Sequence, residues 1–148
     1  MDADRRETLH FPHEMQSYMV DGNEFSTLEE FSEHFSQRVL DGSYRWRGSL
    51  DAFNDILRGG FGTPEEGFRL VWEHSELSRN RLGYAETSRQ LELRLRNCHP
   101  TNRIAVGAEL EDAEDGKGPT VFDWLVEINQ RHGPGGAECQ DGVVLELR

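Results

Sequence analysis

Two aspartates spaced four residues apart are the side chains of this chain whose types and spacing best suit chemistry. Asp51 and Asp55 lie in the segment 49–58, which has the apolar spacing of a helix. They are neighbours on the face opposite the apolar side chains, where like charges cost about a few tenths of a kcal/mol. Such a pair is most often a solvated polar face, and otherwise it binds a cation or a basic partner. The apolar residues that position it by packing on the core are Leu50, Phe53 and Leu57.

The overall charge favours a basic partner over an anionic one. The 148 residues include 28 acidic and 16 basic side chains, a net charge of −12. Nucleic acid and anionic membranes would be repelled, whereas a basic protein would be steered toward the chain. No apolar run approaches the roughly 20 residues of a membrane span, and the first residues lack the apolar region of a secretory signal. We therefore expect a cytoplasmic protein, and we separately expect its free form to be monomeric.

The hydrophobic pattern predicts strands separated by helices. Strands are expected at 17–20, 68–72 and 143–147, and helices at 26–40, 49–58, 75–82, 85–98 and 119–131. Ser26 and Glu29 fit a capping box at the first helix, and Pro119 fits the first position of the last one. Helical crossovers imply parallel pairing, so we expect an α/β fold with a small three-stranded parallel sheet and helices packed against it.

Two further segments complete the expected organisation. Residues 1–15 are polar and aperiodic and are expected to form a flexible arm before a single domain over 16–148. Within 85–98, the alternation from Leu91 to Leu95 also suits a strand. The acidic segment 105–118 is expected to be an exposed, mobile loop that could contact a basic partner.

The segment that holds the two aspartates is also where the chain resembles a known family. The run Val20-Asp21-Gly22, followed by Arg47-Gly48-Ser49-Leu50-Asp51-Ala52-Phe53-Asn54-Asp55-Ile56-Leu57-Arg58-Gly59, resembles the barstar family of intracellular inhibitors of the bacterial ribonuclease barnase. The similarity extends over roughly 16–82 and 119–148, with 83–118 as an insertion.

This resemblance implies a protein inhibitor that blocks a ribonuclease inside the cell, as an immunity protein or antitoxin does, and not an enzyme. Asp55 falls on the position whose carboxylate enters the phosphate-binding pocket, and Asp51 and Glu127 fall on further acidic contact positions. A carboxylate can replace phosphate because it forms charge-assisted bonds to guanidinium groups. The residues expected to contact the partner are Tyr44, Arg45, Trp46, Ser49, Asp51, Asn54, Asp55 and Glu127.

Several alternatives remain open. The ring of Trp46 is either an interface anchor or part of the chain's own core. Arg45, Arg47 and Asn54 depart from the family pattern, which favours an interaction module with a non-nuclease partner. The least favoured alternative is an enzyme that holds Mg²⁺ through Asp51, Asp55 and Glu127. The scattered histidines have no zinc spacing, so no metal or other cofactor is expected.

Overall fold

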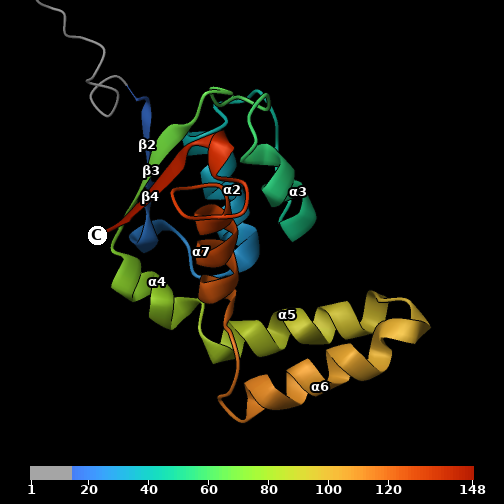
Figure 1. Ribbon diagram of the computed structural model, residues 1–148. Helices are drawn as coiled ribbons and strands as arrows, with labels where there is room; N and C mark the ends of the chain where they lie inside the picture. The colour runs from blue at the N-terminus through green and yellow to red at the C-terminus, as the bar shows by residue number, and fades with distance from the viewer. Residues whose placement is uncertain (1–14) are drawn as a thin grey trace, which may run out of the picture.

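The protein folds into one three-stranded sheet with helices gathered on one side and a helical hairpin that projects from it (Figure 1). The structure is a computed structural model that describes residues 15–148, so almost all of the expected arm 1–15 lies outside the described residues. Its strands are β2 (Ser17–Asp21), β3 (Phe68–Glu73) and β4 (Val143–Leu147). Its α-helices are α2 (Leu28–Arg38), α3 (Leu50–Ile56), α4 (Ser75–Arg81), α5 (Tyr84–Asn97), α6 (Arg103–Glu114) and α7 (Val121–Arg131).

The sheet confirms the expected α/β fold class. Its strand order is β2-β3-β4, and both pairs are parallel, with Val20 beside Trp72 and Leu70 beside Leu145. Every second residue of β3 is fully buried, which is the pattern of a central strand that packs against helices. Within residues 15–148, no helix has the length and apolar character needed to cross a membrane.

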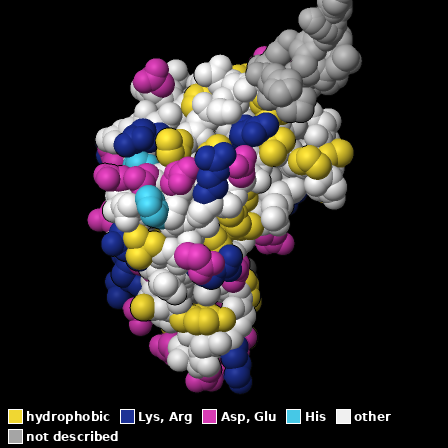
Figure 2. All heavy atoms as spheres, turned by 90° about the vertical axis from the view of Figure 1, so that its left-hand side faces the viewer, with side chains coloured by type: hydrophobic (Ala, Val, Ile, Leu, Met, Phe, Trp, Pro, Cys, Tyr) yellow, Lys and Arg dark blue, Asp and Glu magenta, His cyan; other side chains and the backbone are white. Residues whose placement is uncertain are grey.

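The other side of the sheet carries charges of both signs together with some hydrophobic side chains (Figure 2). Acidic and basic side chains are intermixed on the face that Figure 2 shows. Arg69 lies 3.5 Å from Glu146 on the neighbouring strand, and Arg148 pairs with Glu146 and with Glu73. The Arg69–Glu146 and Arg148–Glu73 pairs connect β3 to β4, and the intermixed charges leave no single-sign surface on this side (Figure 2).

Two expected helix starts are displaced, that of α2 by one residue and that of α7 by two. Thr27, and not Ser26, caps α2: its hydroxyl accepts a hydrogen bond from the Glu30 N–H. Glu29 is therefore free to bind α5. At α7 the cap is Thr120, which forms a capping box with Asp123, so Pro119 precedes the helix instead of opening it. In both helices a threonine side-chain oxygen that accepts from a free backbone N–H marks the start.

The expected loop at 105–118 is wrong, because most of this segment is helix α6. Val106, Leu110 and Ala113 share one face of α6 and pack on Leu91 and Leu95 of α5. Residues 91–95, whose alternation also suited a strand, are part of helix α5, which this packing stabilises. The many acidic residues of α6 lie on its outer side, where they are compatible with a helix that has one apolar stripe.

Candidate partner-binding surface

Helix α3 presents both aspartates to solvent, as their spacing predicts. Asp51 and Asp55 are exposed, whereas Phe53 and Ile56 on the opposite face are fully buried. Ser49 caps the helix as expected, since its hydroxyl accepts a hydrogen bond from the Ala52 N–H. The core therefore fixes which face of this short helix points outward.

Asp55 already has a basic neighbour within the chain. Arg58 Nη1 donates to Asp55 Oδ1 at 2.8 Å, and the same guanidinium donates to Glu138 at 2.8–2.9 Å. Glu138, and to a smaller extent Asp55, raises the pKa of Arg58 above its ordinary value. Any cationic group that binds Asp55 must therefore compete with Arg58.

Asn54 ties α3 to the end of α7 through a partly buried polar chain. Its Oδ1 lies 2.7 Å from Nε2 of the buried His132 and accepts a hydrogen bond from Arg131 at 3.3 Å. The other ring nitrogen of His132 lies 2.7 Å from a carboxylate oxygen of Asp141. Asn54 is thus occupied by contacts within the chain that hold α3 in place. These hydrogen bonds carry no signal in the sequence, because Asn54 lies about 80 positions before the residues that it contacts.

The loop before α3 corrects one prediction. Trp46 is 1% exposed, so its side chain belongs to the core and cannot anchor a partner as an exposed ring. It stacks on Phe53 with ring centroids 4.5 Å apart, and its Nε1–H donates to the Ser49 carbonyl at 2.7 Å. The ring therefore supports the start of α3 from within.

Two other expected contact residues of this loop stay exposed. Tyr44 is 40% exposed and packs edge-on against Phe61. Arg45 extends over α2, where it forms a 3.0 Å ion pair with Glu33. Both side chains are therefore accessible to a partner, although each is already held by a neighbour.

Glu127 lies on α7 and shares a depression with α3. Asp51, Asn54 and Arg131 line this hollow of about 280 Å³ together with Glu127 and part of α5. Three of the expected contact residues thus meet at one place. Asp55 does not line it, although it lies one turn further along the same helix.

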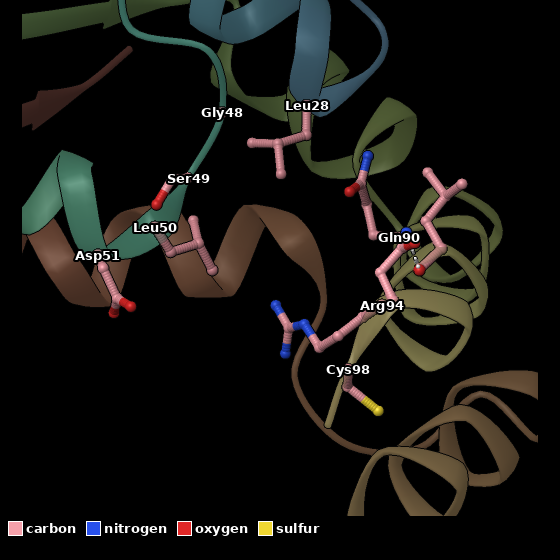
Figure 3. A pocket seen from close by; sticks show the side chains of 10 residues that line it. Leu28, Gly48, Ser49, Leu50, Asp51, Gln90, Arg94 and Cys98 are labelled. Carbon is pink, nitrogen blue, oxygen red and sulfur yellow. Dashed lines mark hydrogen bonds between the residues drawn. The ribbon is translucent and has the colours of Figure 1, made fainter. Parts of the chain in front are cut away.

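A larger cleft of about 600 Å³ separates α3 from α5 (Figure 3). Ser49 and Asp51 line one side, and Gln90, Arg94 and Asn97 of α5 line the other. Arg94 reaches from α5 toward the α3 side, with its guanidinium over the Trp124 ring at 5.3 Å. The sequence offered no signal for this cleft, because nothing in the spacing indicates where the segment 83–118 packs.

The three carboxylates proposed for Mg²⁺ do not gather around one point, since Asp55 lies outside the hollow that Asp51 and Glu127 line. Among the described residues, the group that could surround one ion is instead His132, Glu138 and Asp141. These side chains already bind one another or Arg58. Asp51, Asp55 and Glu127 therefore do not form a three-carboxylate cation site.

The fold and the site define a small α/β protein whose three-stranded parallel sheet supports an exposed acidic helix. A protein-family model described as Barstar (barnase inhibitor) matches residues 15–101, more than half of the chain, and the chain belongs to this family. The matched range ends within 83–118, so it leaves the expected correspondence of residues 119–148 untested. No curated protein and no solved structure matches the chain.

Proposed function

We propose that this protein binds and inhibits a basic ribonuclease inside the cell, with α3 as the centre of its binding surface. Asp55 enters the cationic site that normally holds RNA phosphate, and Asp51 and Glu127 extend the acidic contact. The protein acts by occupying the catalytic cleft of its partner and not by chemistry of its own.

The observation that carries this proposal is the exposure of both α3 aspartates in a chain of the barnase inhibitor family. The buried Trp46 binds the start of α3, and the Asn54–His132 contact ties α3 to the end of α7. The position of α3 is therefore fixed before binding. A preformed surface lowers the entropy cost of association. The net charge of −12 further favours rapid encounter with a basic enzyme.

The test measures inhibition of barnase by the wild-type chain and by Asp55→Asn, using RNA cleavage for activity and calorimetry for affinity. Removing one partner of a buried charge pair costs about 2–5 kcal/mol. The exposed Arg58–Asp55 pair that must be given up contributes only about 0–1 kcal/mol. The net loss is about 1–5 kcal/mol, so Asp55→Asn should weaken binding by about fivefold or more.

Asp112→Asn is the matched control, since it removes the same charge from an exposed position on α6. It should leave affinity nearly unchanged. Equal effects of the two substitutions would mean that only net charge matters, and failure of the wild-type chain to bind barnase would refute the proposal for this class of ribonuclease. Stable binding to a protein without nuclease activity would instead favour the interaction module.

A further inference from the structure

We infer that helix α5 of the α5–α6 hairpin forms a second wall of the binding surface, and that Arg94 receives an acidic group from a loop at the rim of the bound ribonuclease. The inference rests on the proposed function and deepens it, because it assigns a role to a segment outside α3. The cleft between Asp51 and Arg94 would hold that loop.

The size of α3 requires a wider contact surface. A helix of seven residues is about 10 Å long and about 10 Å wide, so its exposed face offers on the order of a few hundred Å² at most. A stable protein–protein interface buries about 800 Å² on each partner. A ribonuclease seated on Asp51 and Asp55 must therefore extend over neighbouring elements, and α5 forms the opposite side of the cleft that borders Asp51.

The hairpin is held firmly enough to act as a wall. The buried carboxylate of Glu86 on α5 accepts a hydrogen bond from the Leu28 N–H at the start of α2, at 2.9 Å. The Thr87 hydroxyl accepts another from the Val121 N–H at the start of α7, at 2.8 Å. The apolar cluster between α5 and α6 also packs on Trp124 of α7. The orientation of α5 relative to the domain is thus fixed from two helices.

The two walls carry opposite charges that are not joined to each other. Among residues 15–148, neither Asp51 nor Arg94 has an oppositely charged group within 4.0 Å. Arg94 instead lies over an aromatic ring with its charge still exposed. A partner loop with a basic group toward Asp51 and an acidic group toward Arg94 would satisfy both, and such complementarity fixes the register of an interface.

Calorimetry with barnase tests this arrangement through Arg94→Glu and Asn97→Glu. Asn97 lines the cleft one turn beyond Arg94, and its substitution leaves the Arg94–Trp124 contact intact. Each variant should weaken binding by about tenfold or more, because an acidic wall repels an acidic group. Arg96→Glu reverses the charge of an exposed residue that does not line the cleft and should change affinity by less than about threefold.

The outcomes separate this inference from the proposed function. If Asp55→Asn weakens binding while Arg94→Glu and Asn97→Glu behave like Arg96→Glu, the second wall is overturned and the proposed function stands. If the wild-type chain does not bind barnase, both fail. Circular dichroism of each variant confirms that the helices are retained, and Asn97→Glu keeps the test valid if Arg94→Glu unfolds.

Discussion

The attachment of the hairpin to the domain predicts a large effect of one conservative substitution, Glu86→Gln. Glu86 lies in the first turn of α5 and is buried, with a side chain that is 5% exposed. Its carboxylate accepts hydrogen bonds from the Leu28 N–H, from Arg89 at 2.7–2.8 Å and from Gln90 at 2.9 Å. Glutamine preserves the shape of the side chain, while it removes the charge and one acceptor oxygen.

The expected loss follows from which of these bonds survive. The amide oxygen still accepts from the Leu28 N–H, but Arg89 loses a charged partner, and a hydrogen bond to a charged group contributes about 1.5–3 kcal/mol. Arg89 is partly exposed and keeps its ion pair with Glu29, so the loss should lie near the lower end of that range. We expect Glu86→Gln to lower the free energy of unfolding by about 1.5–2 kcal/mol.

Glu86→Ala should cost about 1–3 kcal/mol more, because the buried Leu28 N–H is left without its acceptor. Urea unfolding followed by circular dichroism measures both losses, and hydrogen exchange of the α5 amides shows whether the hairpin opens locally. Glu92→Gln removes the same charge from an exposed position of α5 and serves as the control. Losses below about 0.5 kcal/mol for Glu86→Gln and Glu86→Ala alike would refute the anchoring role of Glu86.

Three further predictions concern residues around α3 and α2. Trp46→Ala should lower the free energy of unfolding by about 3–5 kcal/mol, since the ring is fully buried, and a thermal melt that is unchanged would contradict its place in the core. Burial lowers the pKa of His34 below its ordinary 6.5, and its Nε2 accepts the Asp21 N–H at 3.0 Å. As pH falls, the imidazole of His34 is therefore protonated first in the unfolded state, so the free energy of unfolding should fall below pH 6.5. His34→Gln should remove this contribution, which is measured as a smaller difference in stability between urea titrations at about pH 7.5 and about pH 5.5. Arg58→Gln frees Asp55 from a competing cation, so barnase affinity measured by calorimetry should stay equal or rise; a tenfold loss would mean that Arg58 itself contacts the partner.

The fold was largely predictable because its determinants are local. The strands around Leu70 and Val143 and the helix that carries Phe31 and Phe35 each show a hydrophobic period within a few residues of sequence. Parallel pairing then followed from the intervening helices. The exact caps were missed because adjacent hydroxyl residues, here Ser26 and Thr27, can both open a helix, and tertiary contacts choose between them.

The site was predictable only in part. The exposure of Asp51 and Asp55 follows from helical spacing, whereas three features depend on contacts between distant segments. These are the burial of Trp46, the contact of Asn54 with His132, and the cleft between α3 and α5. A wide aromatic side chain in a polar loop carries no local signal of whether it packs inward. Helix α6 was not predicted because its few apolar residues, which pack on α5, are spread among more numerous acidic residues.

Two arginines near α3 form ion pairs within the chain, and these pairs change how their positive charge bears on function. Arg45 and Arg58 add positive charge near α3, which by itself disfavours a basic partner. In the structure each is compensated within the chain, Arg45 by Glu33 and Arg58 by Glu138 as well as by Asp55. Their charges therefore do not cancel those of the α3 aspartates. Arg58 still leaves Asp55 reachable, because Glu138 can hold the Arg58 guanidinium when Asp55 binds a partner. When a ribonuclease cation displaces Arg58 from Asp55, Arg58 would thus keep its ion pair with Glu138 and not become fully solvated. The free-energy cost of exchanging the partner of Asp55 is therefore small.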